Sequence, residues 1–368
     1  MKRCPQKRDV RIDSMRGLML VVMTIDHLPN PIREYTAESI GFVTAAEGFV
    51  FLSGYVAGLV YTRRLYERGP SAMWRSAYRR SGEIYLYHLL TFVGLFLLLR
   101  VFGDASAQIR TWQSLMQAHW LTALLSGATF LYQPELLGIL PLYCLLVLFT
   151  PLLINGLNKG KLWLILSAAC ALWALAQFNV QEAVLSQVVN RFPVHSGAFD
   201  ILGWQLLFVV GLALGFYVRD GAESIAPRGA LPLTAAFVIV ALLFMFRHDF
   251  VPGSLNLDLR EFAVKRTVGP VRIVNFFALA LLIGSPRLWP ARQSWVKCLA
   301  FLGRNSLQVF TFHIAMVYLL GALWPNLVQE SAWLQLTATL ATVAALFLPA
   351  WVNEVRKTGF SGPRCRLL

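Results

Sequence analysis

Long apolar segments alternate with short polar ones along almost the whole chain. Ten segments have the length or the apolarity to cross a bilayer, at residues 14–28, 39–62, 83–102, 136–156, 161–178, 200–218, 231–247, 270–285, 299–323 and 332–352. The apolar stretch at 113–132 contains Gln117 and His119, which favours a re-entrant or interfacial helix over an eleventh span. The pattern predicts an all-α polytopic membrane protein in which residues 1–368 form one integral membrane domain.

The basic residues recur in short runs between the apolar segments, and their distribution predicts the orientation. With the N-terminus inside, most of the 33 Lys and Arg residues fall on the cytoplasmic side, as the positive-inside rule requires. Ten spans then leave both termini in the cytoplasm. The loop at 247–272 on the opposite side is also basic, and it is either an ordinary outer loop or a polar mouth that meets a sugar or an anion.

Composition supports a membrane protein and excludes several other classes. The chain is 57% hydrophobic and 14% charged, whereas about a quarter of an ordinary soluble domain is charged. The net charge of +14 does not indicate nucleic-acid binding, because the basic residues are spread between spans rather than gathered on one domain. We expect no metal, since no His, Cys and carboxylate set has ligand spacing. Glycine loops typical of ATP or dinucleotide sites are also missing.

The first span carries the strongest candidate chemistry. Charged residues at membrane depth cost roughly 2.5–3.5 kcal/mol each on insertion scales, so they are rarely kept without a role. Arg16 and His27 lie almost three helical turns apart, roughly 16 Å, and project from nearly the same face. Asp13 could pair with Arg16, which is otherwise an ordinary cytoplasmic arginine. His27 is either a buried core histidine or a general base.

A general base needs an orienting partner, and two carboxylates are candidates. Asp26 precedes His27 directly, but adjacent side chains diverge on a helix. Glu47, at the outer end of the second span, must face protein or a water-filled cavity. The small residues Gly48, Gly54 and Gly58 that follow it predict a helix-packing seam. Ser53, between them, is a minor candidate for a nucleophile.

The ninth span repeats the arrangement of an arginine followed by a deeper histidine. Arg304 enters from the cytoplasm and His313 lies farther along the same segment. Gly303 indicates a helix break whose backbone amides could meet an anion. A functional His313 and an ordinary buried histidine remain equally open.

Together these residues resemble the membrane acyltransferase type 3 superfamily. The resemblance rests on Arg16 with His27 and on the Leu302–Ser306 run with His313, while the Glu47–Gly54 run is similar to the OpgC branch. It implies about ten transmembrane helices in the bacterial inner membrane. It also implies transfer of an acyl group, succinyl or acetyl, from cytoplasmic acyl-CoA to a hydroxyl of a periplasmic or surface glycan, such as an osmoregulated periplasmic glucan. In this resemblance His27 matches the catalytic histidine and Arg16 the arginine required on the same helix.

We therefore expect two groups of site residues. The catalytic group is His27, Asp26 and Glu47, and the group that holds acyl-CoA is Arg16, Arg304, Asp13 and His313. One departure concerns the ninth span, where Asn305-Ser306-Leu307 replaces the superfamily's more usual Ile-Ser-Tyr. The expected partners are membrane lipid and the glycan acceptor. Two other readings stay open: a transporter or flippase for a glycan or anionic lipid, and a scaffold or sensor.

Overall fold

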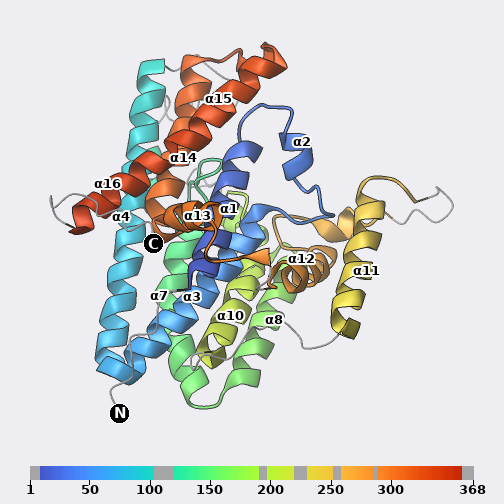
Figure 1. The fold of residues 1–368 in the computed structure, drawn as a ribbon. Coiled ribbons are helices and arrows are strands. Elements are labelled where there is room, and N and C mark those ends of the chain that lie inside the picture. Colours follow the sequence, from blue (N-terminus) through green and yellow to red (C-terminus); the bar gives the residue numbers. More distant parts are fainter. Residues whose placement is uncertain are drawn as a thin grey trace.

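The structure is a computed structural model that describes residues 9–102, 120–189, 197–218, 230–251, 258–285 and 288–358. These residues form α-helices joined by loops and by short 3-10 turns (Figure 1). In chain order the helices are α1 (Val10–Asp26), α2 (Arg33–Thr36), α3 (Ala45–Arg68), α4 (Pro70–Phe102), α6 (Trp120–Ala128), α7 (Ile139–Asn158), α8 (Leu162–Gln177), α9 (Val180–Val189), α10 (Ile201–Tyr217), α11 (Ala230–Arg247), α12 (Pro270–Ile283), α13 (Ser294–Arg304), α14 (Ser306–Leu323), α15 (Ala332–Ala345) and α16 (Phe347–Thr358).

The prediction of an all-helical, multi-pass membrane protein is confirmed. Within the described ranges, six stretches are long and apolar enough to cross a bilayer, namely α3, α4, α7, α11, α14 and the run through α15 and α16. The helices α8, α10 and α12 are apolar but shorter. The total of ten spans and the cytoplasmic placement of both termini stay predictions. Of the segment at 113–132, residues 113–119 lie outside the described residues, and residues 120–128 form α6.

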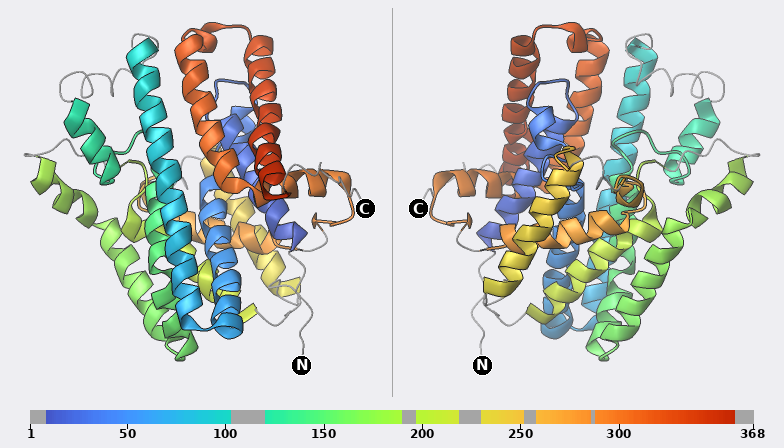
Figure 2. Two further views of the ribbon diagram at one scale, coloured as in Figure 1. Left: turned by 90° about the vertical axis from the view of Figure 1, so that its left-hand side faces the viewer. Right: turned by 90° about the vertical axis from the view of Figure 1, so that its right-hand side faces the viewer.

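Three predicted spans differ in detail from the helices that form. The helix expected at 83–102 already begins at Pro70. The segment expected at 299–323 is broken at Asn305 into α13 and α14, and α13 runs crosswise to the long helices (Figure 2). The last segment is divided at Leu346 into α15 and α16. Hydropathy locates these segments but does not show where an apolar run changes direction.

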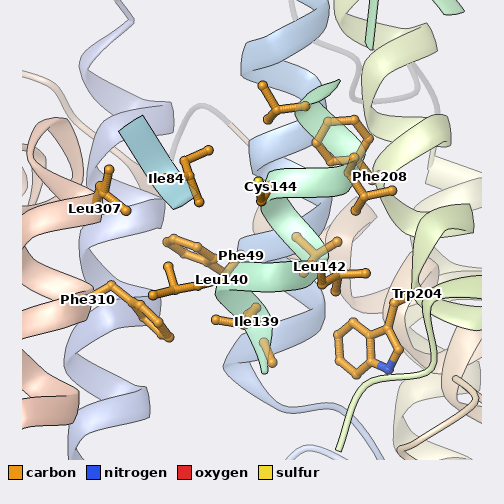
Figure 3. Close-up of a cluster of buried hydrophobic side chains, with 14 of the residues drawn as sticks. Phe49, Ile84, Ile139, Leu140, Leu142, Cys144, Trp204, Phe208, Leu307 and Phe310 are labelled. Atoms are coloured by element: carbon orange, nitrogen blue, oxygen red, sulfur yellow. The ribbon is translucent and has the colours of Figure 1, made fainter. Parts of the chain in front are cut away.

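The long helix α4 connects the two ends of the molecule. In Figure 1, α14 lies beside its upper part and α3 and α7 lie beside its lower part. Between these groups, Phe49 of α3, Ile84 of α4, Leu140 of α7 and Phe310 of α14 meet in one buried cluster (Figure 3). The cluster continues to the fully buried Trp204 of α10. The core therefore joins helices that are far apart in the sequence.

Helices α3 and α10 pack with their backbones in contact, through glycines on both. A Cβ atom at Gly54 would lie 2.1 Å from the carbonyl oxygen of Phe208, and one at Gly211 would lie 2.3 Å from that of Phe51. The packing seam predicted for the second span is confirmed at Gly54 and also at Gly58, which faces Leu212. Small residues allow this approach between membrane helices, where apolar burial alone gives no driving force.

The seam predicts that Gly54→Ala destabilises the protein. The added methyl group has no space unless α3 and α10 separate, and overpacking of this kind costs about 1–3 kcal/mol. Thermal unfolding of the detergent-solubilised protein should therefore occur at a lower temperature. The matched control is Gly82→Ala on α4, where an added Cβ meets nothing within 4 Å. Equal unfolding temperatures for the two variants would contradict the seam.

Candidate active site

The end of α1 places His27 beyond the last helical turn. Asp9 begins the helix by accepting a hydrogen bond from the Arg11 amide at 2.9 Å. At the other end, the Asn30 side chain donates to the carbonyl oxygens of Ile25 and Leu28 at 2.8 and 2.9 Å. Pro29 follows closely and prevents the helix from continuing. His27 is therefore the C-cap residue, and its ring turns toward α14.

His27 meets His313 from α14. Nδ1 of His27 lies 3.0 Å from Nε2 of His313, and the two rings meet edge to edge, with centroids 5.3 Å apart and planes inclined by 15°. Nδ1 of His313 lies 2.9 Å from the carbonyl oxygen of Phe310. His313 is fully buried. Within the described part of the chain, Nε2 of His27 has no hydrogen-bond partner, so this nitrogen is available to a substrate.

Arg16 joins the same two helices nearer their N-terminal ends. The side chain is only 5% exposed, and its Nη2 donates to Oγ of Ser306 at 2.7 Å. Its guanidinium also lies over the Phe49 ring, 5.6 Å from the centroid, a geometry that favours a cation. Arg16 and His27, predicted to share one face of α1, both face α14.

Helix α13 crosses α1 at a contact between two backbones. A Cβ atom at Gly17 would lie 1.9 Å from the carbonyl oxygen of Leu299, and one at Gly303 would lie 1.8 Å from that of Asp13. Oγ of Ser14 donates to the carbonyl oxygen of Val296 at 2.7 Å. The open side of Gly303, where the sequence suggested an anion site, is therefore filled by α1.

Asn305, at the break between α13 and α14, is held by the last helix. Its Oδ1 accepts hydrogen bonds from Asn353 at 2.6 Å and from Nζ of Lys357 at 2.9 Å. Its side-chain amide donates to the carbonyl oxygen of Phe301 at 3.0 Å. The residue is 1% exposed. These bonds fix the angle at which α14 leaves α13, and hence the position of His313.

The two carboxylates expected to orient His27 are engaged elsewhere. Oδ1 of Asp26 accepts from Oγ1 of Thr36 at 2.5 Å. Oε2 of Glu47 accepts from the Thr44 amide at 2.9 Å, which closes a capping box at the start of α3. Oε1 of Glu47 lies 2.7 Å from Nη1 of Arg272. Neither carboxylate forms a hydrogen bond with His27, and His313 takes the place expected for them.

Arg272 is a residue whose role the sequence did not reveal. It was counted among the charges of the 247–272 loop, but it is 2% exposed and lies in the first turn of α12. Its guanidinium contacts Glu47, Glu38 and the carbonyl oxygen of Ala263. The sequence did contain a signal for this ion pair, since Glu47 and Arg272 begin two apolar segments on the same predicted side of the membrane.

The remaining predicted residues lie apart from the histidine pair. Asp13 is 3% exposed and packs under α13. Arg304 is exposed at the end of α13, with its guanidinium 5.9 Å from the Phe301 ring centroid. The buried hydroxyl of Ser53 has no hydrogen-bond partner among the described residues. No base activates this hydroxyl, so the structure does not support Ser53 as a nucleophile.

A family model described as OpgC protein matches residues 8–358. The chain belongs to the OpgC family. The match covers both helices that carry the histidine pair, and it confirms the resemblance found in the sequence. No curated protein and no solved structure matches the chain.

Charged residues of both signs lie near the site in this OpgC-family protein. The positive charges of Arg33 and Lys265 lie close enough to act on His27, and both side chains are exposed. Other basic residues of the 247–272 loop form ion pairs, such as Arg260 with Asp249 and Arg266 with Glu182. Among the described residues, no cluster of three His, Cys, Asp or Glu side chains is arranged to hold a metal ion.

The buried ion pair predicts that Glu47→Leu destabilises the protein more than the double variant Glu47→Leu, Arg272→Leu. The single change leaves a buried guanidinium with Glu38 as its remaining carboxylate partner, which costs up to about 3–5 kcal/mol, whereas removal of both charges is often close to neutral. The unfolding temperatures of the single and the double variant in detergent measure the two losses of stability. If Glu47→Leu unfolded like wild type and lost only activity, Glu47 would act in the chemistry rather than in folding.

Proposed function

We propose that this OpgC-family protein is an inner-membrane O-acyltransferase that moves an acyl group from cytoplasmic acyl-CoA to a hydroxyl of an envelope glycan. A periplasmic glucan is the acceptor that family membership favours. The observation that carries the proposal is the pair of His27 and His313, in which one ring nitrogen of His27 is engaged and the other is available. A neutral histidine of this kind is the usual general base near neutral pH.

In the proposed reaction, Nε2 of His27 removes the proton from the glycan hydroxyl. The oxygen then attacks the thioester carbonyl, the C–S bond breaks, and an ester forms. The departing thiolate takes the same proton back from Nε2, so that free CoA leaves and His27 returns to its starting form. A positioned base of this kind contributes roughly 10²–10⁴ to the rate. No covalent acyl-enzyme is required.

The donor is proposed to enter from the cytoplasmic side of the α1–α14 pair. Arg304 is exposed at the break before α14, where its guanidinium can bind the phosphates of CoA. Arg16 holds α1 to α14 through Ser306 and contributes positive charge along the same wall. The distance from Arg16 to His27 is roughly 16 Å along the helix. An extended pantetheine arm is long enough to span it. The thioester would then meet the acceptor at His27.

Two cations near the site favour succinyl over acetyl as the acyl group. A succinyl thioester ends in a carboxylate, whereas an acetyl group has no charge to recognise. Arg33 and Lys265 are exposed and act electrostatically on both His27 and Asp26, and neither has a salt bridge to a described residue. We propose that they bind the carboxylate of the donor while its carbonyl lies at His27.

The histidine mechanism predicts that His27→Ala abolishes acyl transfer while the protein still accumulates in the membrane. We expect a loss of at least about 10²-fold, because the base is removed and the core is barely disturbed. Mass spectrometry of envelope glycans from cells with wild type, His27→Ala or no chain measures the transferred group. The matched control is His248→Gln, since among the described residues His248 contacts the Ser39 carbonyl and the rings of Phe244 and Phe250, apart from the histidine pair.

Three outcomes separate the readings. An acyl mass that requires His27 but not His248 supports the enzyme. An acyl mass that persists in His27→Ala contradicts the mechanism. Identical glycan masses in all cells, with the protein present in the membrane, contradict acyl transfer and favour the transporter.

The carboxylate proposal predicts that Lys265→Ala reduces the preference for succinyl-CoA over acetyl-CoA. An exposed ion pair contributes about 0.2–1 kcal/mol, so the ratio of kcat/KM values should fall by up to about fivefold. The rate with acetyl-CoA should stay unchanged. A Lys265→Arg variant, which keeps the positive charge, is the control. Equal losses of kcat/KM with both donors would show that Lys265 does not bind the carboxylate of succinyl-CoA.

A further inference from the structure

We propose that His313 is a positioning residue that fixes the tautomer of His27, through a chain of hydrogen bonds that starts at the Phe310 carbonyl. This inference rests on the proposed function, because it assigns the proton-accepting atom of the base. It also makes a statement about the resting protein that can be tested without any reaction.

The chain begins at an atom that can only accept. The carbonyl oxygen of Phe310 lies 2.9 Å from Nδ1 of His313, and a carbonyl oxygen carries no proton to donate. Nδ1 of His313 must therefore carry the proton and donate it to Phe310. Both residues lie on α14, so the helix itself holds this bond.

The second step follows from the burial of His313. The side chain is fully buried, and no ion pair to it exists among the described residues, so the neutral form is favoured over a buried charge. A neutral imidazole has one N–H and one lone pair. With Nδ1 protonated, the lone pair of His313 is on Nε2, the atom that lies 3.0 Å from Nδ1 of His27.

The third step assigns the base. Since Nε2 of His313 can only accept, Nδ1 of His27 donates to it. A neutral His27 then carries its lone pair on Nε2, the nitrogen without a protein partner among the described residues. The opposite tautomer would present an N–H to the substrate hydroxyl and leave two lone pairs facing each other within the pair.

The same chain supports His27 while it holds the substrate proton. Protonation at Nε2 leaves the Nδ1 proton and its bond to His313 in place, so no group has to reorient during the reaction. The two rings meet edge to edge with planes inclined by only 15°, so the N–H of one nitrogen points at the lone pair of the other. His313 thereby does for His27 what the expected carboxylates would have done, without placing a charge in the core.

The test compares two substitutions at His313 by nitrogen NMR and by activity. Protein labelled with ¹⁵N-histidine, in nanodiscs, reports which nitrogen of His27 is protonated, and His27→Gln assigns the signal. In His313→Gln, the amide oxygen can reach the position of Nε2 and accept the bond, so we expect the wild-type tautomer and a rate within about tenfold of wild type. In His313→Leu nothing accepts it, and we expect mixed tautomers and a loss of about 10²-fold in kcat, with an unchanged KM for acyl-CoA.

The outcomes distinguish this inference from the proposed function. A wild-type His27 protonated on Nε2 would overturn it, as would a His313→Leu protein that keeps both the tautomer and the rate. Should His313→Leu fail to fold, the wild-type spectrum and His313→Gln decide alone. A protein with the expected tautomer but no acyl transfer would refute the acyltransferase and leave the hydrogen-bond chain intact.

Discussion

The contact between the backbones of α1 and α13 is the constraint on which the site depends. Gly17 and Gly303 leave no side chain between the helices, so α13 is fixed at one depth against α1. The chain turns at Asn305 directly afterwards, and α14 must begin beside Arg16. With that contact set and the turn at Asn305 held by α16, α14 runs in the direction that brings His313 to His27.

The buried charged side chains among the described residues each have a partner. In an apolar interior an unpaired charge or donor is expensive, which explains the bonds of Arg272 to Glu47 and Glu38. That ion pair ties α3 to α12, and it leaves Glu47 unable to orient a base. The histidine pair also satisfies its buried polar atoms by hydrogen bonding, but its two members are neutral. His27 is thus held in place by a neutral partner instead of a carboxylate.

Much of the fold followed from periodicity and hydropathy, because bilayer thickness fixes how long an apolar helix must be. The same reasoning placed Arg16 and His27 on one face, since both lie on a single helix of known geometry. It did not pair His27 with His313, because hydropathy says nothing about which helices touch or how they cross. Asp26 was suggested by sequence proximity, and its carboxylate instead accepts from Thr36. Arg272 was missed because its partner lies on another helix.

The bonds from Asn353 and Lys357 to Asn305 have a consequence for the order in which the protein becomes complete during synthesis. Helix α1 carries one histidine, and it must wait for α14 to supply the other. The turn that directs α14 is held in part by α16, which is synthesised later than α14. The final register of the two ring nitrogens therefore depends on a helix that is synthesised after both histidines.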